Sequence, residues 1–341
     1  MIIEDELKSL AIEEGCIRSG IARREIFSEA PPSADMQYLK PWANTIVSFA
    51  VSTGTDWIED YLGKVTRMVM RDNMYHVYHN LYRIGTLMAD RLRSEGFKAH
   101  AIIPNGLYRP DHTFEKETPD HDIKPPLSLR YVAVGAGVGT FGWSGNVMVP
   151  GYGSNVYLGG VLTDAELQPD NPMEETLCDK CLICARVCPV GFINDTPKEQ
   201  VAVTIAGRKY AYNRKRGDLR CIIGCGGFTG LSKDRTWSSW STGRTILPHE
   251  NDSLPERFAA LRDDPANIAA KRNITFGKRG VLDRPKENIK TTCNHCITVC
   301  SGPLEVRKKW MNLLFDSGVV ELDPEGREVV IPLSPSLRNI P

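Results

Sequence analysis

The stretch Cys178-Asp-Lys-Cys181-Leu-Ile-Cys184-Ala-Arg-Val-Cys188-Pro189 decides how this sequence is interpreted. Its four cysteines are separated by two, two and three residues, and a proline follows the last of them directly. This spacing is typical of ligands to 4Fe–4S clusters, in which three close thiolates bind one cluster and the fourth thiolate binds a second cluster. A zinc knuckle would instead present its ligands as two pairs, which this spacing does not offer.

A second cysteine group lies further along the chain, as a second cluster requires. Cys293, Cys296 and Cys300 are separated by two and three residues. Two 4Fe–4S clusters need eight thiolates, and the two groups supply seven. The eighth ligand is therefore Cys221 or Cys225, which lie between the groups.

We expect each cluster to combine cysteines from distant parts of the chain. The ligands expected for the first cluster are Cys178, Cys181, Cys184 and Cys300. The ligands expected for the second cluster are Cys188, Cys293, Cys296 and one of Cys221 and Cys225. The remaining Cys16 lies alone in an amphipathic N-terminal helix, where a cysteine is most often part of the core.

Composition limits the class of protein. The chain has 341 residues, of which 41% are hydrophobic and 25% charged, as in ordinary globular proteins. Its 42 Lys and Arg balance 42 Asp and Glu, which disfavours a protein that binds nucleic acid mainly by charge. No apolar run approaches the roughly 20 residues that cross a bilayer, and the acidic N-terminus lacks the pattern of a signal peptide. We therefore expect a cytoplasmic protein with no membrane partner.

Hydrophobic periodicity predicts the main elements of the first half. A helix and a turn are expected within residues 1–30, a buried strand over Thr45–Val51 and a long helix over Met68–Gly96. A second strand is expected over Ala99–Ile103, and the polar stretch Asn105–Pro126 is expected to be a loop.

A glycine-dense segment, residues 135–145, follows this loop. Gly137, Gly139 and Gly142 match the dinucleotide fingerprint, but that fingerprint requires a helix directly behind the glycines. Further glycines and Pro150 follow at once, so no such helix can form. We expect instead that the backbone approaches a large flat ligand closely, since glycine has no Cβ.

This central segment resembles a known family. Ala136–Asn146, Pro150–Ser154 and Leu158–Asp164 are similar to the central block of epoxyqueuosine reductases, and reductive dehalogenases carry a similar block. In that family a cysteine run of the ferredoxin type follows this block closely, as it does here. Asp218–Ile222 also resembles the isolated-cysteine segment of the family, which favours Cys221 as the eighth ligand.

The resemblance implies an α+β fold, with a nitroreductase-like α/β core that binds a corrinoid and a two-cluster ferredoxin-like domain. The expected domains are residues 1–170, residues 171–310 with an insertion at about 226–290, and a C-terminal extension over 311–341. The family also predicts a helix over Tyr131–Val134, where alternation alone suggests a strand. The cofactor is expected to be cobalamin or another corrinoid in the base-off form, and its expected contacts are Gly137, Gly139, Gly142, Gly145, Asn146, Tyr152, Gly153 and Ser154.

The implied activity is a corrinoid-dependent reduction supplied with electrons through two 4Fe–4S clusters. We favour a small organic substrate, as in reductive dehalogenases, and an external low-potential electron donor such as ferredoxin or flavodoxin. The alternatives are epoxyqueuosine in tRNA, or an electron-transfer protein without a substrate of its own. Only 41 residues follow Cys300, fewer than the helical-repeat tail with which many epoxyqueuosine reductases grip tRNA. The sequence also allows a homodimer.

The proton donor and the insertion leave alternatives. Epoxyqueuosine reductases carry an acidic donor at a position that corresponds here to Ile123, next to Asp122. Either the correspondence shifts by one residue and Asp122 is the donor, or the acid is missing. Dehalogenases use a tyrosine, and the candidates of that type are Tyr108, Tyr152 and Tyr157.

The insertion is either a surface elaboration or dimer contact, or a lid over the substrate; its notable residues are Trp237, Trp240, Arg244 and His249.

Overall fold

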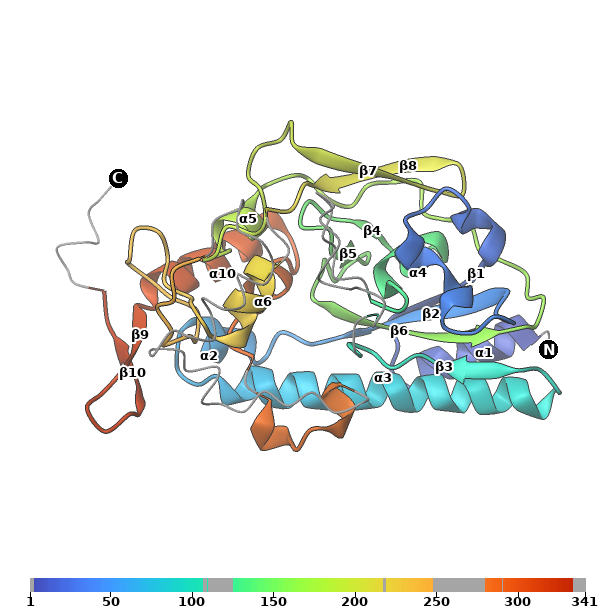
Figure 1. Ribbon diagram of the computed structural model, residues 1–341, viewed down its shortest axis with the longest axis horizontal. Helices are drawn as coiled ribbons and strands as arrows, with labels where there is room; N and C mark the ends of the chain where they lie inside the picture. The colour runs from blue at the N-terminus through green and yellow to red at the C-terminus, as the bar shows by residue number, and fades with distance from the viewer. Residues whose placement is uncertain are drawn as a thin grey trace.

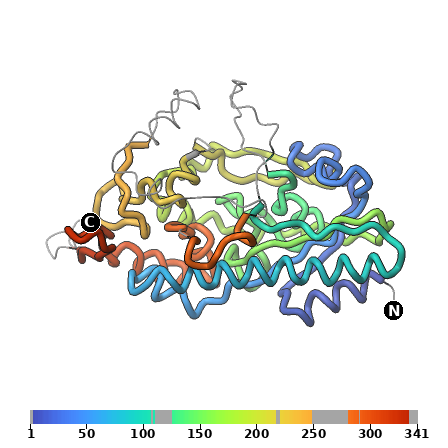
Figure 2. The backbone as a smooth tube through the Cα atoms, turned by 60° about the horizontal axis from the view of Figure 1, so that its bottom comes forward, coloured from blue at the N-terminus to red at the C-terminus, as the bar shows by residue number. Residues whose placement is uncertain are grey.

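The fold is a mixture of helices and strands (Figure 1). The computed structural model describes residues 3–106, 109, 125–216, 219–247, 280–289 and 291–333. A four-stranded sheet lies in one half of the molecule, and the cysteine-bearing segments lie in the other half. The long helix α3 (Met68–Ser94) runs beneath both halves, as Figures 1 and 2 show.

The four-stranded sheet is antiparallel, with the strand order β1-β2-β6-β3. Its strands are β1 (Arg18–Arg23), β2 (Thr45–Ser52), β6 (Val156–Thr163) and β3 (Ala99–Ala101). Strands β2 and β6 pair over their whole length, from Thr45 opposite Thr163 to Ser52 opposite Val156. Because β2 is buried on both faces, its sequence is an almost continuous apolar run, the pattern that predicted a buried strand.

Helices cover both faces of this sheet. Successive side chains of a strand point to opposite faces, so Val47 and Phe49 of β2 pack in the same cluster as α3, whereas Ile46 and Ala50 pack in the cluster of α4 (Leu129–Gly135). Helix α1 (Ile3–Glu13) joins α3 on its face through buried Leu7 and Ala11.

Shorter elements complete the structure. The hairpins are β4 (Thr140–Phe141) with β5 (Val147–Met148), β7 (Gln200–Ile205) with β8 (Arg208–Asn213), and β9 (Val319–Leu322) with β10 (Glu328–Ile331). The further α-helices are α2 (Ile58–Leu62), α5 (Ile183–Arg186), α6 (Leu219–Gly226), α9 (His295–Thr298) and α10 (Leu304–Asp316). The 3-10 helices are Arg24–Phe27, Pro32–Ala34, Met36–Tyr38, Val281–Asp283 and Lys286–Asn288.

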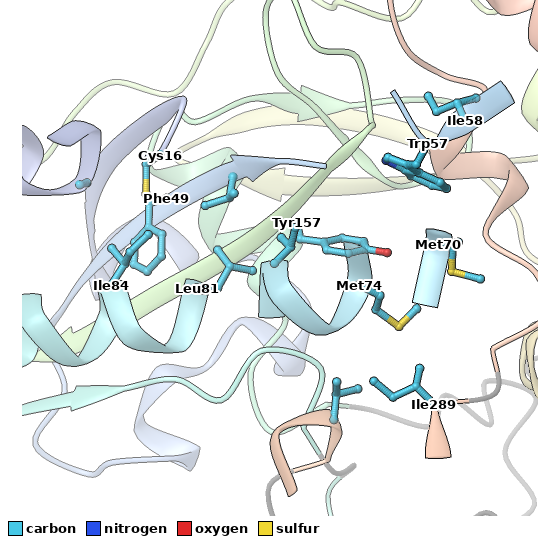
Figure 3. Packing of buried hydrophobic residues seen from close by; sticks show 14 of the residues in the cluster. Cys16, Phe49, Trp57, Ile58, Met70, Met74, Leu81, Ile84, Tyr157 and Ile289 are labelled. Atoms are coloured by element: carbon cyan, nitrogen blue, oxygen red, sulfur yellow. The ribbon is translucent and has the colours of Figure 1, made fainter. Parts of the chain in front are cut away.

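One hydrophobic core connects the sheet to the cysteine-bearing half. The hydrophobic cluster beneath the sheet includes Cys16, Phe49 and Ile84, and Figure 3 shows that it extends past Tyr157 toward Trp57. It continues into the second half through buried side chains that include Ile183, Val187, Val299, Trp310 and Leu314. Each fully buried side chain of this size stabilises the fold by roughly 1.5–3 kcal/mol, so this shared core holds the cysteine segments against the sheet.

Part of the expected insertion belongs to this core. Trp237 and Trp240 are both buried, and the indole of Trp240 donates a hydrogen bond of 2.9 Å to the carbonyl of Tyr61. Arg244 donates to the Val320 carbonyl and pairs with Glu321 of β9. Over residues 226–247 the chain is therefore not a surface elaboration, and His249 lies outside the described residues.

Most of the predicted elements are confirmed. The strand over 45–51 and the helix over 68–96 are present, and the helix ends before Gly96, which adopts a φ of 89°. The helix over 131–134 is part of α4. The strand predicted over 99–103 is shorter, since β3 ends at Ala101. Within the described residues, no helix combines the length and the apolar character needed to span a membrane.

Candidate metal centre

Four cysteines from two distant segments line one partly open cavity of about 330 Å³. They are Cys178, Cys181, Cys184 and Cys300, the set that the spacing assigns to a first cluster. Burial, together with neighbouring thiols that include the other three, raises the pKa of Cys184. The thiol of Cys184 therefore resists ionisation unless a cation compensates the negative charge.

The loop around Cys181 has an uncommon backbone conformation. Lys180 and Leu182 adopt φ angles of 55° and 59°, a left-handed region that residues other than glycine seldom occupy. These angles turn the chain sharply on both sides of Cys181, and α5 then begins directly and carries Cys184. Such strained residues cluster at functional sites, and here they bring three thiols to one cavity.

Hydrogen-bond donors are directed at the sulfur atoms of the first set. The backbone N–H of Trp143 lies 3.2 Å from the Sγ of Cys178, and a guanidinium N–H of Arg307 lies 3.2 Å from the Sγ of Cys181. Burial raises the pKa of Cys300, while hydrogen bonds from Ser154 oppose that rise. Hydrogen bonds to sulfur stabilise the thiolate form and are a means by which proteins tune iron–sulfur clusters.

A second set of thiols gathers beside the first. Burial, and then the thiols of Cys188, Cys296 and Cys221, raises the pKa of Cys293 well above its ordinary value. Burial, and then Cys221 and Cys188, raises the pKa of Cys296 to about 12. The backbone N–H of Phe192 donates to the Sγ of Cys188 at 3.2 Å. These mutual interactions mean that four thiols from three segments lie close together.

Cys221 and Cys225 both lie on α6, one helical turn apart, and they differ in their neighbours. Cys221 is exposed on one side, yet the protein atoms around it, and then Cys225 and Cys188, raise its pKa to about 12. Burial raises the pKa of Cys225 to about 11; its thiol neighbours are Cys296 and Cys221, and its Sγ lies 3.7 Å from the Ile222 carbonyl. Cys221 therefore interacts with more thiols of the second set than Cys225 does.

Two lysines accompany the second set, of which Lys64 is buried and Lys215 is half-buried. Lys215 contacts the Ser144 carbonyl and lies 5.1 Å from the centre of the Phe192 ring. Burial lowers its pKa to about 8, and the thiols of Cys296 and Cys221 act in the opposite direction. Burial likewise lowers the pKa of Lys64 to about 7. Neither lysine has a carboxylate partner among the described residues, so both are suited to balance negative charge on the thiolates.

The glycines predicted to contact a flat ligand are packed against protein. A Cβ at Gly137, Gly139 or Gly153 would overlap the backbone of Asn171, Met148 or Cys300, respectively. A Cβ at Gly142 would lie 3.0 Å from the Met148 sulfur, and one at Gly145 would lie 3.2 Å from the Tyr212 ring. The close approach that these glycines allow is an approach between protein segments, so it does not by itself provide a surface for a ring.

The other predicted contacts differ from one another. The side-chain amide of Asn146 lies 3.7 Å from the Sγ of Cys296. Ser154 is buried, and its hydroxyl donates to the carbonyls of Cys296 and Ile297 at 3.5 and 3.4 Å. Tyr152 is 41% exposed. Asn146 and Ser154 thus connect the glycine-rich segment to the second cysteine segment.

The candidate proton donors are only partly described. Tyr108 and Asp122 lie outside the described residues. Tyr157 is buried, accepts a 3.1 Å hydrogen bond from the amide of Asn294 and stacks on Tyr78 at 4.6 Å between ring centres. Burial raises the pKa of Tyr157, which keeps its phenol protonated beside the residue that follows Cys293.

Arg307, Asp179, Lys215 and Lys64 were not singled out by the sequence. Each is a charged residue in a polar stretch, and only the tertiary structure brings it to the thiols. Asp179 and Lys180 lie between two cysteines of the run, and this position was the one sequence signal that a charged residue would lie near the thiols. Among the described residues, no group of three or more His, Cys, Asp or Glu surrounds a point that would hold a single metal ion.

Comparisons with known proteins give two kinds of relative. The chain is 32% identical to the epoxyqueuosine reductase of Bacillus anthracis over 103 residues, 29% of this chain and 27% of that protein. It is 28% identical to the tetrachloroethene reductive dehalogenase of Sulfurospirillum multivorans over 156 residues, 42% of this chain and 30% of that protein. The match thus spans about a quarter to a third of the length of these relatives.

A solved structure is also similar. It is described as "Reductive dehalogenase structure suggests a mechanism for B12-dependent dehalogenation"; it has a TM-score of 0.48 and 17% identity, and the match covers 96% of this chain and 41% of that chain. No protein-family model matches this sequence.

Proposed function

We propose that the chain belongs to the superfamily that contains epoxyqueuosine reductases and reductive dehalogenases, and that it is an oxidoreductase that holds two 4Fe–4S clusters. Its proposed ligands are Cys178, Cys181, Cys184 and Cys300 for the first cluster, and Cys188, Cys221, Cys293 and Cys296 for the second. The proposed fold is a nitroreductase-like core joined to a two-cluster ferredoxin-like domain.

The observation that carries this proposal is the convergence of thiols from three distant segments. Thiols from residues 178–188, α6 and residues 293–300 interact with one another, and four of them, Cys178, Cys181, Cys184 and Cys300, line one cavity. Thiolate sulfur is a soft ligand that iron–sulfur clusters use, and the donor set fits them.

The chain's own residues prepare these sites for electron transfer. A 4Fe–4S cluster supplies one-electron transfer at a potential set by charge, hydrogen bonds and solvent exposure. The buried side chains of Trp143, Ile183 and Val299 limit the access of water to the first set. The N–H groups of Trp143 and Phe192 hold the sulfurs of Cys178 and Cys188 in place.

A corrinoid follows from the resemblance and fits the described residues less well. The glycines predicted to contact it are in contact with protein, so they do not by themselves offer a surface for its ring.

We propose epoxyqueuosine in tRNA as the substrate, in place of the small organic molecule favoured from the sequence alone. The support is the similarity to curated epoxyqueuosine reductases, which reaches 42% identity over 103 residues with the Listeria monocytogenes protein. The second candidate, an organohalide, is supported by the longer match to the dehalogenase, 156 residues.

The test is an assay of the anaerobically reconstituted protein, with and without cobalamin, under a low-potential reductant. We expect conversion of an epoxyqueuosine-containing tRNA stem-loop, with binding that weakens as salt rises because phosphate contacts release counterions. Reduction of chlorinated ethenes without conversion of the stem-loop would favour the second candidate. Turnover of neither compound, in protein that holds its iron and binds cobalamin, would contradict both substrates.

A further inference from the structure

Arg307 connects helix α10 to the first cysteine set. It is 9% exposed and lies among the residues that line the first cavity. Its Nη1 lies 3.2 Å from the Sγ of Cys181. This is the one guanidinium N–H···S contact recorded within the described residues, and it places a permanent positive charge against a proposed cluster ligand.

Asp179 fixes the orientation of this guanidinium. Its two carboxylate oxygens accept hydrogen bonds of 2.9 and 2.7 Å from Nη1 and Nη2 of Arg307. A planar guanidinium matches a carboxylate in this two-pronged way, and an ammonium group cannot. Because Asp179 lies between Cys178 and Cys181, the cysteine loop itself holds the arginine that contacts its sulfur.

One donor of Arg307 has no partner. Its Nε is buried and makes no hydrogen bond with any described atom. A buried donor without an acceptor is costly, and this one belongs to a side chain that lines the first cavity. An anionic sulfur-rich occupant of that cavity would offer an acceptor of the right kind.

We propose that Arg307 is a positioning residue that raises the reduction potential of the first cluster relative to the second. This inference rests on the proposed function, because it requires that the first cysteine set holds a cluster. Reduction adds one negative charge, which a nearby cation and an N–H···S hydrogen bond stabilise. Asp179 orients the donor, and its own charge partly offsets the cation.

The experiment is a redox titration of the reconstituted protein, followed by electron paramagnetic resonance and visible absorption. In Arg307→Met we expect at least a tenfold fall in the ratio of reduced to oxidised first cluster at a fixed potential. For a one-electron couple this is a shift of about 59 mV to lower potential. Arg307→Lys keeps the charge and loses the fork, so its potential should lie between those of Arg307→Met and the unaltered protein.

The matched control is Lys308→Met. Lys308 is the next residue of α10, has a side chain that is 49% exposed and pairs with Glu305 at 3.2 Å. Because solvent screens the charge of Lys308, the loss of that charge should leave both reduction potentials unchanged. The inference would be overturned if Arg307→Met shifted the reduction potentials of both clusters equally, or left both unaltered. A shift as large in Lys308→Met would overturn it too. Loss of iron from the unaltered protein would instead overturn the proposed function, and this inference with it.

Discussion

Replacement of Cys300 by serine is expected to halve the iron content of the reconstituted protein, from about eight to about four irons per chain. Cys300 comes from the second cysteine segment, but the structure places it in the cavity of the first. A serine hydroxyl at this position ionises far less readily than a thiol and is a harder ligand. The first cluster should therefore be lost although Cys178, Cys181 and Cys184 are intact.

Metal analysis and the visible absorption of the purified protein measure this loss. Cys16→Ala is the matched control, because Cys16 is buried in the core and 5% exposed, and it should retain all of the iron. If Cys300→Ser kept about eight irons per chain, the crossing of ligands between the two segments would be wrong. A loss of the second cluster instead of the first would contradict the assignment equally.

The second large effect concerns the two cysteines of α6. Cys221→Ser is expected to remove the second cluster, about four irons per chain. The reason is that the thiols of Cys188, Cys293 and Cys296 each interact electrostatically with the thiol of Cys221. Cys225→Ser is expected to leave the iron content unchanged. The two variants differ by one helical turn, so each controls for the other.

Electron paramagnetic resonance of the reduced variants distinguishes which cluster is lost. Cys221→Ser should retain the signal of the first cluster alone, and Cys225→Ser should retain the signals of both clusters. The reverse pattern would assign Cys225 as the eighth ligand. Full iron content in both variants would mean that a residue other than these two completes the second set.

The sequence predicted those parts of the fold that local pattern determines. The buried strand β2 and the long helix α3 follow from apolar periodicity, since each buries side chains at its own repeat. The cysteine spacing also predicts two sets of thiols, because a run with a three-residue final gap directs its last thiol to a different cluster, and the four thiols predicted for the first cluster line one cavity.

Other features depend on contacts between distant segments and had no local signal. Arg307 lies 126 positions from Cys181 in the chain, and nothing in the pattern of α10 marks it as a partner of sulfur. The glycines over 137–153 were predicted to face a ligand, but a missing Cβ does not reveal what takes its place. The structure places the backbone of Asn171, Met148 and Cys300 there.

The central claim is that two sets of four thiols each hold a 4Fe–4S cluster, and diffraction at the iron absorption edge tests it most directly. Crystals of the anaerobically reconstituted chain should give two separate anomalous peaks. We expect one peak among Cys178, Cys181, Cys184 and Cys300, and the other among Cys188, Cys221, Cys293 and Cys296. A signal at the zinc edge in their place, or a single iron peak, would contradict the account.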